Sequence, residues 1–430
     1  MEPVTGRRHN LLMSSSLQRN AVAMAVSTVV GVLTAIVVIA IEHIVEDLLH
    51  EVQEADPWVI ASVLVAGAVA AALLVRYLGG RSSSTTETYV EEFHGDHPPL
   101  EARYAPGRLG ASVASLGSGA PLGLEGPAVY SGAVIATLIR KYFSWAGSLD
   151  AKSLLAAGAA AGVSAVFKAP LAGAIFAVEV PYRDRLAGER IVPAMFGSAA
   201  GYLTLAAFEG TDHVLDVGAV ELTFSGAAGS LLLGLVIGLV ARGIIALIRL
   251  AEVYSNKGIP LVRGLAAGVS LAGLFGLGRL LTGENVAITA GFPVVDWALE
   301  PNHSIPLLVA VLLIRSFGTS VAIGGGGAGG LFVPLIATGA IVGRIFADAG
   351  DIEELTLYVL VGGATMLGAG YAAPLTGVII VAELTGQASL VVPALLATTV
   401  AMLTVGNRSV SHAQQSGDVG DPTPQPADSH

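Results

Sequence analysis

Long apolar segments alternate with short polar ones along most of the chain. Residues 21–41 form an uncharged apolar run of 21 residues, and residues 58–75 supply another 18. A helix needs about 20 consecutive apolar residues to cross the hydrocarbon core of a bilayer. Further apolar stretches continue to residue 406, and glycine and proline interrupt several of them. The pattern predicts an all-α polytopic membrane protein whose helices are broken and tilted.

The distribution of charge around the first two apolar runs predicts the orientation of the chain. Residues 1–20 contain three arginines, whereas residues 42–57 contain six acidic residues and neither lysine nor arginine. Basic segments that flank membrane helices stay on the cytoplasmic side. We therefore expect a multi-pass protein of the cell (plasma or inner) membrane. Its expected parts are a cytoplasmic N-terminal segment, a transmembrane domain and a disordered acidic tail, at residues 1–20, 21–411 and 412–430.

Composition rules out a soluble globular protein. Hydrophobic residues make up 53% of the chain and charged residues 13%, whereas an ordinary soluble domain carries about 25% charged residues. Mean hydropathy is +0.71, so membrane lipid is the expected surrounding. The net charge of −11 argues against nucleic acid as a partner. Because the chain has no cysteine, it has no thiolate ligand for a metal ion, and we expect neither a metal site nor a cofactor.

Two motifs occur twice, at nearly the same separation. Residues 169–173 and 373–377 both read A-P-L-x-G. Residues 123–127 (G-L-E-G-P) and 330–334 (G-L-F-V-P) form a second pair. Duplicated halves with interrupted hydrophobic segments are typical of transporters and channels whose site lies near the membrane midplane. The sequence therefore predicts two repeats, at roughly residues 57–208 and 222–406.

The second pair of motifs has the form of helix starts that bind anions. Proline fits the first turn of a helix, and the free amides there carry about half a positive charge and attract anions. Two such helix starts directed at one point would replace the hydration shell of an anion with backbone N–H donors. Each motif alone could equally be a glycine/proline kink that packs against neighbouring helices. Glu125 lies in the first motif, where its carboxylate could contest the anion site or simply cap its own helix.

The two pairs of motifs together resemble those of the CLC family of chloride channels and chloride/proton exchangers, and the resemblance covers nearly the whole membrane part. It implies a CLC-type fold, in which the two repeats are inverted, and a homodimer with one pore in each subunit. The implied substrates are chloride and related anions, with or without protons. It also implies that Glu125 is the gating glutamate. Backbone amides would line an outer anion site (Leu124, Glu125, Gly126) and a central one (Leu331, Phe332).

Departures from the family pattern bear on ion coupling. The family's G-S-G-I-P-E segment, whose serine contacts the central anion, corresponds to residues 82–87, so Ser83 is the implied ligand or else an exposed helix cap. The family's central tyrosine is missing from residues 406–411, and Leu124 replaces an arginine. Val180 takes the place of a glutamate that relays protons in many exchangers. Because valine cannot titrate, this change favours channel-like or weakly proton-coupled chloride conduction, with chloride/proton antiport as one alternative. The missing tyrosine fits a second alternative, fluoride/proton antiport, whereas the retained Ser83 argues against it.

Four polar residues in apolar surroundings leave alternatives open. Lys168 could attract anions to the cytoplasmic mouth of the pathway or simply extend to the membrane interface. Glu179 and its repeat counterpart Glu383 are expected to be structural, with Glu179 capping a helix or pairing with a nearby arginine. Ser118, within G-S-G, could be the nucleophile of an intramembrane hydrolase, but only Lys168 could serve as its base. We therefore expect a transport protein and not an enzyme.

Overall fold

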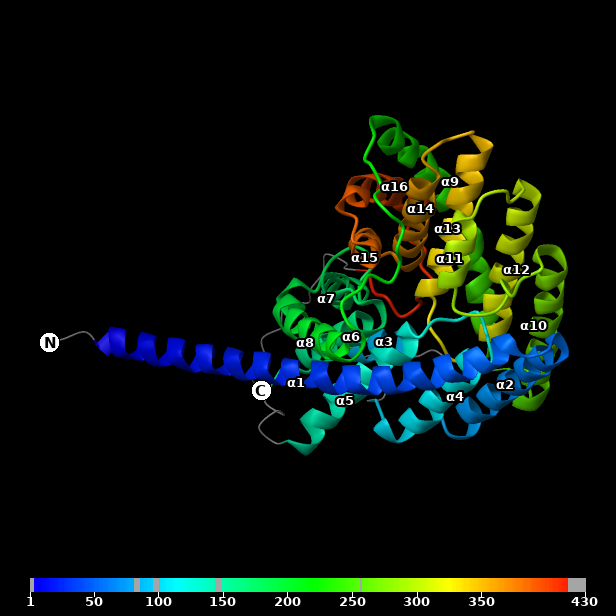
Figure 1. Cartoon of the computed structure of the whole chain (residues 1–430). Helices are drawn as coiled ribbons and strands as arrows, with labels where there is room; N and C mark the ends of the chain where they lie inside the picture. The colour runs from blue at the N-terminus through cyan, green and yellow to red at the C-terminus, as the bar shows by residue number, and fades with distance from the viewer. Residues whose placement is uncertain (1–3, 81–85, 96–99, 144–148, 256, 417–430) are drawn as a thin grey trace, which may run out of the picture.

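The computed structural model describes residues 4–80, 86–95, 100–143, 149–255 and 257–416. In this part of the chain, sixteen α-helices form the fold (Figure 1), and β-structure is limited to two isolated bridges. Eight of these helices are long and apolar enough to cross a membrane. The prediction of an all-α polytopic membrane protein is confirmed.

Eight of these helices lie in the described part of the first half of the chain. Short helices follow long ones where glycine and proline interrupt the apolar pattern. The bounds are α1 (Val4–Glu54), α2 (Pro57–Tyr77), α3 (Thr86–His94), α4 (Ala105–Gly117), α5 (Glu125–Tyr142), α6 (Ala151–Phe167), α7 (Pro170–Glu179) and α8 (Ile191–Glu209).

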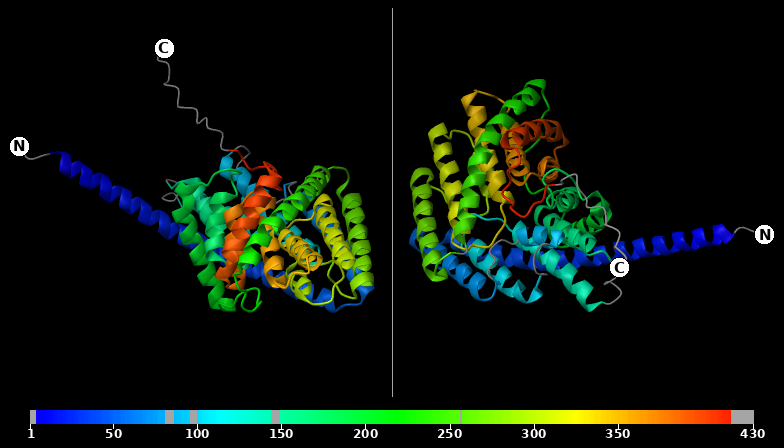
Figure 2. Two further views of the ribbon diagram at one scale, coloured as in Figure 1. Left: turned by 90° about the horizontal axis from the view of Figure 1, so that it is seen from above. Right: turned by 180° about the vertical axis from the view of Figure 1, so that it is seen from behind.

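The first helix is longer than the apolar pattern indicates. α1 continues through the acidic residues that follow its apolar run and ends at Glu54, just before Pro57 starts α2. Charge alone does not end a helix, and the first residue that cannot continue it is this proline. The N-terminal end of α1 extends well beyond the other helices (Figures 1 and 2).

Eight further helices make up the second half. The shorter ones again follow glycine- or proline-containing segments, as they do in the first half. The bounds are α9 (Phe224–Ser255), α10 (Pro260–Thr282), α11 (Phe292–Leu299), α12 (Ile305–Gly324), α13 (Phe332–Ala349), α14 (Leu355–Tyr371), α15 (Pro374–Thr385) and α16 (Val391–Val405).

The two halves repeat the same close helix packing. α5 crosses α6 where Gly132 faces Gly158, and α13 crosses α14 where Gly339 faces Gly362. A Cβ atom on any of these glycines would overlap the facing backbone. Small residues let membrane helices approach backbone to backbone, where van der Waals contact stabilises them. The equivalent crossings in the two halves agree with the duplication predicted from the motifs.

Two glutamates join the halves directly. Glu179, the last residue of α7, accepts hydrogen bonds from the first free amides of α15, and Glu383, near the end of α15, accepts them from α7. The four N–O distances lie between 2.7 and 3.0 Å. Each carboxylate thereby satisfies amides that have no acceptor within their own helix. The two glutamates have the same structural role, as cross-repeat helix caps.

Candidate functional site

The loops before α5 and α13 cross each other at two glycines. Gly123 and Gly330 form an antiparallel β-bridge, with N–O distances of 2.8 and 2.6 Å. Two residues later α5 begins at Glu125 and α13 begins at Phe332. The starts of one helix from each repeat therefore lie side by side, as the paired motifs indicate.

The carboxylate of Glu125 fills the space between these helix starts. The residue is fully buried, and its Oε1 accepts a hydrogen bond from the backbone amide of Phe332. Its Oε2 is buried and has no hydrogen-bond partner. A Cβ atom on Gly123 or Gly330 would overlap this carboxylate. A side chain at either crossing position would therefore displace the carboxylate, one oxygen of which remains unsatisfied.

The structure places the other predicted ligands around the same point, except one. Leu124 is the N-cap residue of α5 and Leu331 that of α13. Gly126 follows Glu125 in the first turn of α5, where backbone amides have no intrahelical acceptor. These amides and that of Phe332 belong to two adjacent helix starts. Ser83 lies outside the described residues.

Aromatic side chains surround Phe332 on several sides. The ring centroids of Phe167, Phe176 and Tyr371 lie 6.0, 4.9 and 4.7 Å from that of Phe332, and all four residues are buried. Phe167 ends α6 and Tyr371 ends α14, each two residues before an A-P-L-x-G motif. The sequence reasoning missed these residues, although an aromatic residue at the same place in both repeats was a usable signal.

A short C-terminal segment, residues 406–416, runs back through the middle of the molecule, where it is drawn in red (Figure 1). The amide of Val410 donates to the carbonyl of Gly370 at 2.8 Å. The side-chain amide of Gln414 donates to the carbonyls of Val180 and Tyr371, both at 2.8 Å. The segment therefore packs against the ends of α7 and α14, next to the site.

The sequence predicts a disordered tail at residues 412–430, but the first residues of this segment are ordered in the structure. Residues 412–416 are held by hydrogen bonds, because Gln414 binds two backbone carbonyls and Gln415 forms a bridge with Tyr182. Residues 417–430 lie outside the described residues.

Lys168 lies among acidic residues at the ends of two helices. Its Nζ is 4.0 Å from Oε2 of Glu209, the last residue of α8. Glu42 and Glu46 of α1 are close enough to interact with it electrostatically. Lys168 itself adopts a left-handed conformation, φ 51°, between α6 and α7. Its charge is therefore balanced locally by carboxylates.

Ser118 and Arg315 bind backbone carbonyls. The hydroxyl of Ser118 donates to the carbonyl of Ser115 at the end of α4, 3.0 Å away. The guanidinium of Arg315, buried in α12, donates to four carbonyls of the loop before α11 at 2.8 to 3.4 Å. Both side chains hold the backbone near the crossing loops.

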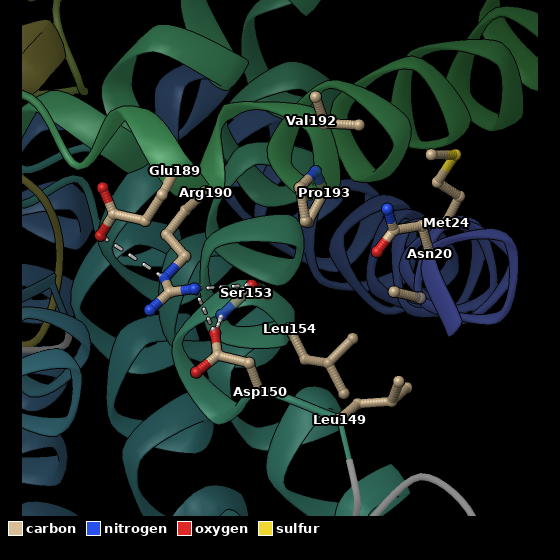
Figure 3. A pocket seen from close by; sticks show the side chains of 11 residues that line it. Asn20, Met24, Leu149, Asp150, Ser153, Leu154, Glu189, Arg190, Val192 and Pro193 are labelled. Atoms are coloured by element: carbon tan, nitrogen blue, oxygen red, sulfur yellow. Dashed lines mark hydrogen bonds and ion pairs between the residues drawn. The ribbon is translucent and has the colours of Figure 1, made fainter. Parts of the chain in front are cut away.

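A pocket of about 500 Å³ lies between α1, α6 and α8 (Figure 3), and its lining residues do not include Glu125. Its cationic group is Arg190, whose Nη1 is 3.0 Å from Asp150 Oδ2 and whose Nε is 3.7 Å from Glu189. Asp150 also caps α6 by accepting from the Ser153 amide. Since these charges are paired with each other, the pocket lacks the free positive charge of an anion site.

Relatives with known names match most of the chain. The H(+)/Cl(-) exchange transporter ClcA of Salmonella paratyphi A is 28% identical over 410 residues, which cover 88% of this chain and 85% of that protein. The ClcA protein of Citrobacter koseri is 28% identical over 428 residues, 92% of this chain and 88% of that one.

Solved structures share the fold. A slow cyanobacterial Cl⁻/H⁺ antiporter superposes with a TM-score of 0.80 at 21% identity, over 90% of this chain and 96% of that one. A CLC-type fluoride/proton antiporter superposes with a TM-score of 0.81 at 21% identity, over 92% and 98% of the two chains. At these identities the structures establish the architecture alone.

The family assignment rests on the sequence itself. Residues 66–406, which include both crossing loops and both A-P-L-x-G motifs, match the model described as voltage gated chloride channel. The chain therefore belongs to the CLC family of chloride channels and transporters.

Proposed function

We propose that this protein exchanges chloride for protons across the cell membrane, and that Glu125 takes part in the movement of both ions. The observation that carries the proposal is the position of its carboxylate: one oxygen accepts from the Phe332 amide and the other is buried without a partner. An ionised carboxylate in apolar surroundings is costly unless it is paired, solvated or protonated. The site can therefore bind a proton, at the carboxylate of Glu125, as well as an anion.

The geometry supports a competition between the carboxylate and chloride. The amides at the starts of α5 and α13 favour negative charge through the helix dipoles. When Glu125 is ionised, its carboxylate binds the Phe332 amide and excludes an anion from that place. When Glu125 is protonated, it loses most of its attraction to these amides, and chloride replaces it. Proton binding and chloride binding are thereby linked at one point.

The names of the relatives favour exchange over the channel-like conduction that the sequence suggests. That expectation rested on Val180, which cannot titrate and lies fully buried at the end of α7. The relatives from Salmonella paratyphi A and Citrobacter koseri are both named exchange transporters. Proton coupling in this chain would then use other groups. Fluoride/proton exchange is the weaker alternative, since only the fold is shared with the fluoride/proton antiporter.

The membrane setting of the proposal follows from charge and from the family. The positive-inside rule assigns the N-terminus and the loop with Arg183 and Arg185 to the cytoplasm, and the acidic end of α1 to the opposite side. Assembly as a homodimer with one pathway in each subunit stays a prediction from the resemblance.

Uphill proton movement in liposomes tests the proposal. We expect that vesicles loaded with chloride and diluted into a low-chloride medium take up protons against a proton gradient as chloride leaves. A pH electrode in a weakly buffered medium follows the protons and a silver chloride electrode follows the chloride. Protein-free vesicles are the control. Chloride efflux with no uphill proton uptake would contradict exchange and favour channel-like conduction.

A further inference from the structure

Three titratable side chains from distant parts of the sequence meet beside the C-terminal segment. Nδ1 of His412 lies 3.5 Å from Oε2 of Glu87 and 3.8 Å from Oε2 of Glu252. Glu87 is at the start of α3, and Glu252 is near the end of α9. The backbone amide of Ala413 also donates to Glu87, at 3.1 Å. The segment thus brings a histidine to two acidic groups of the helix bundle.

Exposure falls stepwise along this cluster. The side chain of His412 is 58% exposed, that of Glu252 is 21% exposed and that of Glu87 is 7% exposed. Ser411, whose hydroxyl interacts with the carboxylate of Glu87, is fully buried. The three side chains therefore lead from the surface of the protein to a buried carboxylate.

Other charged groups near the cluster act on its two acids. Glu91, on the same helix as Glu87, opposes a negative charge there, and Glu87 and Glu252 repel each other. Arg249 attracts the Glu252 carboxylate, while its Nε donates to the carbonyl of Ser409 at 2.8 Å. A proton shared by the two acids and His412 relieves this repulsion.

Tyr371 connects the cluster to the gate. It is 2% exposed, and it is close enough to Glu125, Glu87 and Glu252 to interact electrostatically with each. Its ring packs on Phe332, whose amide binds the Glu125 carboxylate. Its carbonyl accepts a hydrogen bond from the side chain of Gln414 at 2.8 Å, so this buried tyrosine contacts both the C-terminal segment and Phe332 of the anion site.

We propose that His412, Glu252, Glu87 and Tyr371 carry protons between the solution and Glu125. The proposal rests on the exchange proposed above. The route opens beside the loop of Arg183, whose amide donates to the carbonyl of Gln415 in the C-terminal segment. It supplies the titratable groups that Val180 cannot provide.

The proton balance of the route is simple. His412 or Glu252 takes a proton from water and passes it to the carboxylate of Glu87. Tyr371 accepts a proton at its phenol oxygen as it gives up its own towards Glu125, so that it ends as a neutral phenol. Water bridges the gaps between these groups. Every relay group returns to its first state, and the net change is one proton on Glu125.

A double variant, Glu252→Gln with His412→Gln, tests the route in liposomes. Both side chains are partly exposed, so we expect the protein to fold. We expect proton uptake to fall about ten-fold or more, because a positioned acid or base typically contributes at least that to proton transfer. Chloride efflux is expected to continue. Glu189→Gln, which replaces a carboxylate that is 64% exposed and belongs to the pocket of Figure 3, is the matched control and should keep both activities.

Tyr371→Phe provides an independent test of the inner step. It removes the phenol oxygen and keeps the ring against Phe332, so that proton uptake should fall while chloride efflux persists. Full proton uptake in the double variant, or an equal loss of chloride and proton movement in both variants, would overturn the route. A wild-type protein without uphill proton uptake would overturn the exchange and the route together, whereas coupled wild type and coupled variants would overturn the route alone.

Discussion

Replacing Glu125 by glutamine should abolish proton uptake while chloride still crosses the membrane. Glutamine has nearly the shape of a protonated glutamate but cannot exchange a proton at neutral pH. Its neutral side chain is held less strongly at the Phe332 amide than a carboxylate, since hydrogen bonds to ionised groups are roughly twice as strong. We therefore expect chloride flux that no longer depends on pH and proton uptake reduced at least about ten-fold.

Chloride efflux measured at several pH values, with proton uptake in the same vesicles, checks this result. Glu189→Gln again serves as the control, because it removes a carboxylate outside the crossing loops. An unchanged pH dependence of chloride flux in the Glu125→Gln variant would contradict the role of Glu125 as the gate.

Replacing Arg315 by methionine should destabilise the protein by about 3 kcal/mol or more. Its guanidinium donates to the carbonyls of Val286, Ile288, Thr289 and Ala290, and a hydrogen bond typically contributes about 1 kcal/mol. Thr289 adopts a left-handed conformation, φ 79°, which is uncommon for a β-branched residue. Without Arg315, four carbonyls of this loop lose their side-chain donor.

The loss of stability in the Arg315→Met variant should extend from this loop to the residues around Glu125. The amide of Thr289 donates to the carbonyl of Gly119 at 3.0 Å, just before the turn that leads to Gly123. Thermal unfolding in detergent, followed by the fluorescence of the buried Trp297 on the adjoining α11, measures the effect. Arg279→Met is the control, since Arg279 donates to a single side chain, that of Asn285. An Arg315→Met variant that unfolds at the same temperature as the wild type would contradict this account.

The sequence was sufficient to predict the helix starts and their duplication. Glycine and proline encode where a helix can begin, and their spacing encodes the repeat, so α5 and α13 were predictable from residues 123–127 and 330–334. The same local information did not show that Gly123 and Gly330 pair, or that Glu125 binds the Phe332 amide. Those contacts depend on the packing of segments some 200 residues apart.

Long-range hydrogen bonds account for the other differences. Glu179 was expected to cap a helix or to pair with a nearby arginine; it caps a helix, but the helix is α15, whose bonded amides lie 196 and 197 residues further along the chain. Residues 412–416 lack apolar residues in a regular pattern, so composition indicated a tail, whereas Gln414 anchors them. The position of Tyr371 beside Phe332 likewise follows from the crossing of helices and not from any local motif.

Anomalous diffraction from crystals grown in bromide tests the central claim most directly, because bromide can replace chloride and is located by its own scattering. In the Glu125→Gln variant we predict a bromide within hydrogen-bond distance of the Phe332 amide, at the place that the Glu125 carboxylate fills in the wild type. Well-ordered crystals of this variant with no bromide between the starts of α5 and α13 would contradict the account.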